Sequence, residues 1–195
     1  MSRKMCINTV LILAVVVVLG ACSSKAKSGS RKTPHNLIHP TGALVGVDPS
    51  STTRMICEVE AKKDIAHSGV GFDTIEPLRP AWDKASRIYS CDYVYAAGAK
   101  MTLSVKETSS AAAATAYFDS LAERLGKTRS LFGTGEGAYT TIGGDIVVRK
   151  DSKVLLVDVS KLPRRFGKPA DTREGIATNV AVGIMGCWGS SGAIG

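Results

Sequence analysis

Between residues 54 and 188, apolar side chains recur with two periods, one typical of strands and one typical of helices. Residues 100–107 alternate most clearly, because every second side chain is apolar and those between are polar. Residues 87–95 are rich in aromatic and β-branched side chains, which strands favour. These patterns predict two strands, and three further strands are predicted at 138–142, 145–149 and 154–159.

The last predicted strand, 154–159, is apolar at almost every position. A strand of this kind has both faces covered, so we expect it in the centre of the sheet. Asp151 and Ser152 precede it and predict a hairpin turn. Residues 69–85 contain Pro77 and Pro80, and they are expected to be irregular.

Three helices are predicted in the same region. Residues 57–67 form a short one, with Val59, Ala61 and Ile65 on its inner side. The strongest helix starts after Ser109 or Ser110, which can cap it, and stops at Gly126. Its inner stripe consists of Ala114, Tyr117, Phe118, Leu121, Ala122 and Leu125. An apolar helix at 173–188 closes the domain, and a Gly/Ser-rich tail follows at 189–195.

The predicted order is helix, two strands, helix, three strands, helix (α-β-β-α-β-β-β-α). Because hairpins join most of the strands, we expect a mostly antiparallel sheet with helices packed on it, an α+β sandwich. Residues 54–188 are long enough for one such domain with its own core. The sequence contains no internal repeat.

A different pattern precedes this domain. A short basic start leads into a nearly unbroken apolar run at 7–19, which is shorter than the ~20 residues that a membrane-spanning helix needs. A basic head, an apolar middle and small residues at a cleavage site are the parts of an export signal. We therefore expect residues 1–21 to be removed from the mature protein.

The signal ends in Leu19, Gly20, Ala21 and Cys22. These residues resemble the bacterial lipobox, in which the cysteine thiol receives a diacylglyceryl group and the cysteine becomes the new N-terminus. The resemblance implies that Cys22 anchors the protein to the outer face of the plasma membrane. Two acyl chains hold a protein more firmly than the marginal attachment of one. Residues 22–53 are then expected to form the lipidated N-terminus and a flexible tether, since their Ser, Gly and Lys show no apolar period.

The net charge of the chain is +8, from 25 basic and 17 acidic residues. Two basic residues belong to the signal and four to the tether, namely Lys25, Lys27, Arg31 and Lys32. Removing these six leaves 19 basic residues against 17 acidic ones in the rest of the chain, an excess of two. The excess charge therefore belongs mainly to the signal and tether, and nucleic-acid binding is disfavoured.

Three motifs of the domain occur together: Cys57 opening the first helix, Cys91 within Ser90-Cys91-Asp92-Tyr93, and Gly135-Glu136-Gly137-Ala138-Tyr139 before Val147-Val148-Arg149-Lys150. With them the chain resembles a group of exported lipoproteins of mycobacteria and other actinobacteria, whose activity is undefined. The resemblance covers roughly residues 54–188. It implies a PsbP-like α/β/α sandwich anchored outside the plasma membrane, and it lends no catalytic residues. Cys187 departs from the simpler two-cysteine pattern.

The chain has five cysteines, of which Cys6 leaves with the signal and Cys22 carries lipid. Outside the membrane we expect the other three to contain one disulfide. Cys57–Cys91 is favoured because it would join the first helix to the first strand across the proline-bearing segment. Cys91–Cys187, which would tie the last helix to the sheet, remains an alternative.

Few other residues suggest chemistry. His35 and His39 lie in connector sequence beside prolines and His67 is alone, so no metal site and no cofactor are predicted. The glycines at 133–137 lead into a strand and predict a tight turn rather than a phosphate loop. Asp158 interrupts an apolar strand, and it either marks a pocket or forms an ion pair, for example with Arg149.

The Ser24–Lys27 tetrapeptide matches the S-x-x-K pattern of penicillin-binding enzymes, but it lies in the tether and no Lys-Thr-Gly follows it.

Taken together, these features favour a non-catalytic, lipid-anchored accessory module that binds an envelope protein or a small apolar ligand. Two alternatives remain: an exported enzyme whose site assembles around residues such as Asp158 and His67, and a carrier of an apolar envelope ligand. A carrier would need a cavity between sheet and helix.

Overall fold

The computed structural model describes residues 48–58, 61, 65 and 76–190. The chain divides into two units, residues 1–30 and 31–195, and all of the described residues belong to the second. The lipobox, the S-x-x-K tetrapeptide, the three histidines and residues 191–195 of the predicted tail lie outside the described residues. The first two residues of that tail, 189 and 190, belong to the last helix instead.

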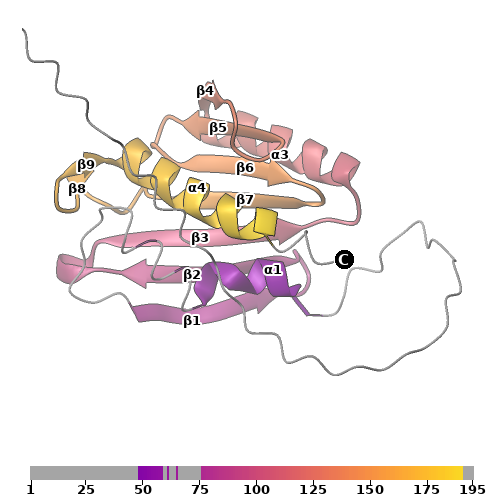
Figure 1. Ribbon diagram of the computed structural model, residues 1–195, viewed down its shortest axis with the longest axis horizontal. Coiled ribbons are helices and arrows are strands. Elements are labelled where there is room, and N and C mark those ends of the chain that lie inside the picture. Colours follow the sequence, from indigo (N-terminus) through magenta and orange to yellow (C-terminus); the bar gives the residue numbers. More distant parts are fainter. Residues whose placement is uncertain (1–47, 59–60, 62–64, 66–75, 191–195) are drawn as a thin grey trace, which may run out of the picture. The chain divides into compact units, whose positions relative to one another are not determined.

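Among the described residues, seven strands form one antiparallel sheet in the order β1-β2-β3-β7-β6-β5-β4 (Figure 1). The strands are β1 (Glu76–Asp83), β2 (Ile88–Val94), β3 (Lys100–Glu107), β4 (Lys127–Leu131), β5 (Gly137–Thr141), β6 (Ile146–Lys150) and β7 (Lys153–Asp158). As predicted, β7 is the central strand and forms a hairpin with β6. A small second sheet pairs β8 (Arg165–Phe166) with β9 (Asp171–Thr172).

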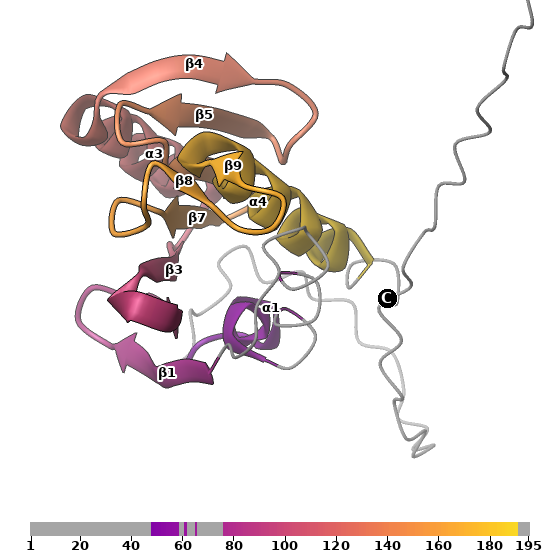
Figure 2. The same ribbon diagram turned by 90° about the vertical axis from the view of Figure 1, so that its left-hand side faces the viewer.

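Helices cover both faces of the large sheet, so the fold is α+β. On one face lie α4 (Arg173–Ser190) and the short α1 (Ser51–Arg54) with its 3-10 turn η1 (Met55–Cys57). The opposite face at β5, β6 and β7 is covered by α3 (Ala111–Leu125). In Figure 2, α3 and α4 lie on opposite sides of the strands between them.

The larger of two core clusters lies between the sheet and α4 with η1. Alternate residues of β3 point into it, and Met101, Leu103 and Val105 are fully buried, as their alternation predicted. The predicted apolar helix at 173–188 is confirmed as α4, and Ile176, Ala177, Val180, Ala181 and Ile184 are buried in this cluster. The smaller cluster packs α3 on the other face and contains Ala114, Leu121, Tyr139, Val147 and Val154.

Both ends of α3 follow the predicted capping. The Ser110 hydroxyl accepts a hydrogen bond from the Ala113 backbone N–H at 3.1 Å, which satisfies one of the donors left open at a helix start. Gly126 ends the helix with φ at +69°, a left-handed conformation that glycine adopts without penalty. The helix boundaries could therefore be predicted from local residues alone.

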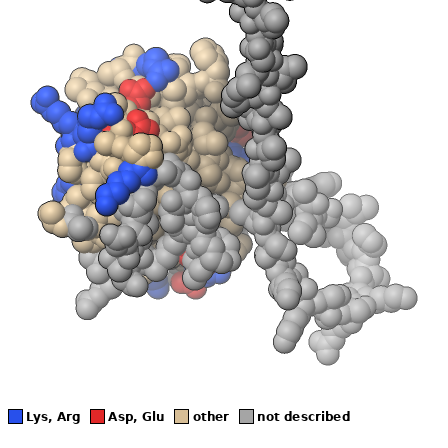
Figure 3. All heavy atoms as spheres, turned by 60° about the vertical axis from the view of Figure 1, so that its left-hand side comes forward, with Lys and Arg blue, Asp and Glu red and all other residues tan. Residues whose placement is uncertain are grey.

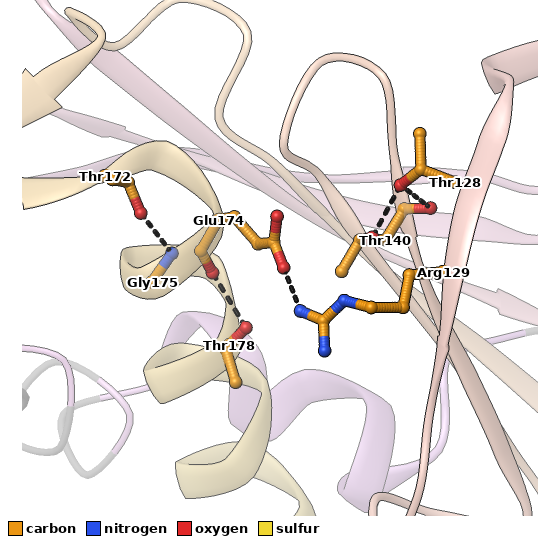
Figure 4. A network of polar contacts seen from close by, with 7 residues as sticks. All are labelled: Thr128, Arg129, Thr140, Thr172, Glu174, Gly175 and Thr178. Atoms are coloured by element: carbon orange, nitrogen blue, oxygen red, sulfur yellow. Dashed lines mark hydrogen bonds and ion pairs between the residues drawn. The ribbon is translucent and has the colours of Figure 1, made fainter.

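The start of α4 is fixed by contacts that the sequence did not indicate (Figure 4). The Thr172 hydroxyl accepts a hydrogen bond from the Gly175 N–H at 3.0 Å and caps the helix. Arg129 on β4 forms an ion pair with Glu174 in the first turn of α4. These contacts hold the helix start beside the edge strand β4.

The expectation that residues 69–85 are irregular is wrong for Glu76–Asp83, which form β1. This strand lies at the edge of the sheet, and its register with β2 shifts between Leu78 and Ala81. Edge strands and bulges are the places where a sheet tolerates proline, because the missing N–H is not needed for the ladder. Pro80 falls within that irregular stretch.

The predicted element order omitted β4 and the β8–β9 pair. The side chains of β4 from Lys127 to Ser130 are exposed, so the strand has no buried face that could produce an alternating pattern. The β8 and β9 strands have two residues each, which is too short for any period. These segments are strands because they pair with a neighbouring strand, and their own sequences carry no pattern that would predict it.

The first predicted helix also differs. Cys57 ends the 3-10 turn that follows α1, instead of opening a helix. Ala61 and Ile65 have helical backbone and are buried, as expected, and Val59 lies outside the described residues. Ordered structure extends into the stretch expected as tether, because α1 begins at Ser51 and its carbonyl at Thr52 accepts a hydrogen bond from the Trp188 indole at 3.0 Å.

Candidate functional site

A cleft of about 490 Å³ lies between α4, the loop joining β4 to β5, and the end of β6. We call it the α4 cleft. It is lined by Gly133, Thr134, Gly135, Glu136, Lys150, Val182, Met185 and Gly186. The cleft opens to solvent, and its volume lies within the range of small-molecule sites.

The loop on one side of the cleft is the tight turn that its glycines predicted. Gly133 and Gly135 have φ angles of +78° and +61°. A Cβ on Gly135 would lie 2.7 Å from the backbone oxygen of Arg149, so only glycine lets the loop approach β6 this closely. The adjacent Glu136 N–H donates to that same oxygen at 2.9 Å. The loop is thereby held against β6.

An ion pair reinforces this contact. The Arg149 guanidinium lies 2.6 Å from the Glu136 carboxylate and also donates to the Glu136 backbone oxygen at 3.3 Å. Arg149 thus pairs with Glu136, and the expected alternative of an Arg149–Asp158 pair is wrong. The carboxylate that lines the cleft is therefore already engaged by a cation.

The opposite side of the cleft is the outer surface of α4. Val182 is 53% exposed there, and Met185 is half-buried. A Cβ on Gly186 would meet no atom within 4 Å outside its own helix, so the missing side chain leaves open space. A flexible thioether beside open space allows ligands of different shapes to pack. This side can hold an apolar group.

Lys150, at the end of β6, supplies the cation of the cleft. No ion pair of Lys150 occurs among the residues that the structure describes. Its Nζ lies 4.0 Å from the position of a Cβ on Gly189, in the last turn of α4. The negative end of the helix dipole favours a cation there. The ammonium group therefore lies close to the apolar surface and is open to an anionic partner.

An exposed aromatic residue is the sequence neighbour of a glycine that lines the cleft. Phe132 directly precedes Gly133 in the loop and is 95% exposed. Covering a large apolar side chain that is almost fully exposed to water lowers the free energy, so Phe132 favours contact with a ligand or a protein.

Asp158, the acid singled out in the sequence, is half-buried and is not among the residues that line the α4 cleft. Its carboxylate accepts a hydrogen bond from the Ser160 N–H at 2.9 Å, which closes a local turn.

The more deeply buried acid nearby is Asp145. Burial raises the pKa of Asp145, although hydrogen bonds from Val159 and Thr141 oppose the rise. Asp145 holds together the turn between β5 and β6.

The predicted disulfide is confirmed. Cys57 and Cys91 are bonded, with their Cα atoms 5.9 Å apart, and the bond joins η1 to β2. Cys187 is a buried thiol in α4, so the alternative Cys91–Cys187 pairing is wrong. Within the described part of the chain, no three His, Cys, Asp or Glu side chains gather as a metal site would require.

Within the described part of the chain, no helical segment combines the length and the hydropathy that a transmembrane span requires. Comparison of the chain with family models, with curated proteins and with solved structures finds no match.

Part of the α4 cleft could be predicted from the sequence. The glycines at 133–137 predicted the turn, whereas the glycine at 186 within an apolar helix was a signal that was missed. The convergence of that glycine, Lys150 and the turn depends on the tertiary structure.

Proposed function

We propose that the protein is a lipid-anchored binding module of the cell envelope, without catalytic activity of its own. Cys22 carries the lipid and holds the protein at the outer face of the plasma membrane, after removal of residues 1–21. The order of basic start, apolar run and lipobox supports this placement. The disulfide between Cys57 and Cys91 supports it independently, because such bonds persist in oxidising compartments.

We further propose that the domain belongs with the PsbP-like exported lipoproteins that its motifs resemble. The α+β fold with an antiparallel sheet and helices on both faces supports that assignment.

The ligand of the module is a small amphiphile with an apolar body and an acidic end. One observation carries this proposal: an ammonium group without an ion-pair partner among the described residues lies beside an open apolar cleft. Val182, Met185 and the open space at Gly186 accept the apolar body, and Lys150 attracts the acidic end. The other ionisable group of the lining, Glu136, is held by Arg149, which favours binding over catalysis.

A pair of matched ligands tests this proposal. The mature protein is titrated with a fluorescent long-chain carboxylate and with the alcohol of the same chain length. We expect the carboxylate to bind more tightly, and Lys150→Gln to reduce the difference, because only the carboxylate has a charge for the ammonium. Equal binding of the two ligands by the unaltered protein would contradict the proposal.

A second variant tests the position of the ligand. Gly186→Leu fills the open space of the cleft, and leucine favours a helix more than glycine does, so the fold should persist. We expect at least tenfold weaker carboxylate binding, whereas Gly186→Ala, which adds only one methyl group, should keep most of it. Hydrolysis of a substrate that maps to this cleft would instead support the enzyme alternative.

The anchor is tested separately. Mass spectrometry of the mature protein should show a diacylglyceryl group at Cys22 and an N-terminus at the same residue. Cys22→Ala should abolish the lipid and release the protein from the membrane fraction. Retention of that variant in the membrane fraction, with unchanged processing, would contradict the anchoring proposal.

A further inference from the structure

A basic segment connects β7 to α4. Residues 161–173 contain five basic side chains and one acidic side chain. Four of the basic residues are exposed and define what we call the basic hairpin: Lys161, Arg164, Arg165 and Lys168. The chain beyond Lys32 has an excess of only two positive charges, so this short segment is much more basic than the rest of the chain.

None of these four cations forms an ion pair with another described residue. The single acid of the segment, Asp171, lies against the first turn of α4, where its carboxylate occupies the space that a Cβ on Gly175 would take. The next acid along the chain, Glu174, is paired with Arg129. Figure 3 brings forward the side of the molecule that carries β8 and β9, and shows Lys and Arg side chains gathered there with few acidic ones between them.

The basic hairpin is also held in place. β8 pairs with β9, and Arg165 donates to the backbone oxygen of Ala170 at 2.7 Å. Arg173 donates from its Nε to the backbone oxygen of Leu162 at 2.7 Å, across the base of the segment. The ring of Phe166 packs on Tyr95 with 5.1 Å between centroids. The cations are therefore presented on an ordered surface, which lowers the entropy cost of binding.

We infer that the basic hairpin docks on the anionic phospholipid headgroups of the membrane to which the protein is anchored, an inference that rests on the proposed lipid attachment at Cys22. Guanidinium groups match phosphate oxygens in geometry and charge. An anchored domain stays close to headgroups, so a clustered set of exposed cations meets them at high effective concentration. A membrane surface is the anionic partner that fits both the charge and the placement.

The length of the tether allows this docking. Residues 22–47 span at most ~90 Å when fully extended, which exceeds the length of α4 several-fold. The hairpin and the α4 cleft lie toward opposite ends of α4, because Arg173 and Gly186 are ~20 Å apart along the helix axis. Docking through the hairpin therefore leaves the cleft open to its ligand.

The test uses the mature chain from residue 22 with Cys22→Ser, which cannot be acylated. Its partition is measured onto vesicles of phosphatidylcholine with and without phosphatidylglycerol, at low and high salt. We expect binding to the anionic vesicles alone, weakened by salt. Each cation near an anionic surface strengthens partition about fivefold, so Arg164→Gln/Lys168→Gln should lower the partition coefficient about 30-fold.

A matched control neutralises two exposed cations elsewhere, Lys84→Gln/Arg124→Gln, and it should retain nearly all of the binding. An equal loss in both double variants would show unspecific charge attraction and overturn the inference. So would equal partition onto neutral and anionic vesicles, or binding only to an acidic protein or polysaccharide. Because the chain tested carries no lipid, these outcomes are independent of the acylation at Cys22, which mass spectrometry decides.

Discussion

The disulfide between Cys57 and Cys91 should contribute a large share of the stability of the domain. It closes a loop with a sequence separation of 34 residues. In the chain-entropy model, a crosslink of that length restricts the unfolded chain and stabilises the folded state by about 3–4 kcal/mol. Domains of this size have total unfolding free energies of about 5–15 kcal/mol, so reduction should weaken the fold severely.

Urea unfolding followed by tryptophan fluorescence measures this effect. With a denaturant slope of about 2 kcal/mol per molar, reduction of the bond should lower the midpoint by about 2 M. Trp188 packs in the larger core cluster, to which both cysteines also belong, so its fluorescence reports on the affected region.

Two variants separate the disulfide from other thiol effects. In Cys57→Ala/Cys91→Ala, the midpoint should already be low and a reductant should change nothing further. In Cys187→Ala, which keeps the bond, the reductant should lower the midpoint by the full amount. If reductant left the midpoint of the unaltered protein in place, the crosslink would not constrain its unfolded state, and the reasoning would be refuted.

Three further predictions concern local contacts. Burial raises the pKa of Glu107, but hydrogen bonds from Ser50 and Thr53 outweigh this effect and lower the pKa below 4.5. Glu107→Gln should therefore lower the free energy of unfolding at neutral pH, measured with urea, by about 1–3 kcal/mol. The stabilisation from a lowered pKa is complete above the pKa of the unfolded chain, near 4.5, and is lost as pH falls through the lower pKa of the folded state. The deficit of Glu107→Gln should therefore shrink as pH falls below 4.5, and a constant deficit would contradict the prediction. Gly135→Ala should destabilise the domain more than Gly133→Ala in thermal melts, since only at residue 135 does a Cβ meet backbone; equal melting shifts would refute this. Ser110→Ala should cost about 1 kcal/mol through the lost cap of α3, and an unchanged urea midpoint would count against that role.

Elements with one face in the core could be predicted closely. β3 matches its predicted range, and the predicted α3 caps are the observed ones. Their signals are local, because a period of two or 3.6 residues follows directly from which face is buried. The edge strands β1 and β4 were missed for the opposite reason. An edge strand pairs with only one neighbouring strand and tolerates proline or polar residues. Its sequence therefore shows little alternation of apolar and polar positions.

The sequence by itself determined the class of the fold, the central position of β7 and the favoured cysteine pair, and it led to the prediction of a membrane anchor at Cys22. The fold class, the position of β7 and the anchor follow from residues that are close together in the chain. The cysteine pair follows from the small number of pairings that three cysteines allow. The tertiary structure decided that Lys150, the 133–137 turn and Gly186 meet in one cleft, and that the acid at 158 lies elsewhere. It also decided that the four exposed cations of the 161–173 segment form no ion pair with a described residue. Sites of this kind depend on which distant segments the sheet order brings together, and local periodicity does not encode that order.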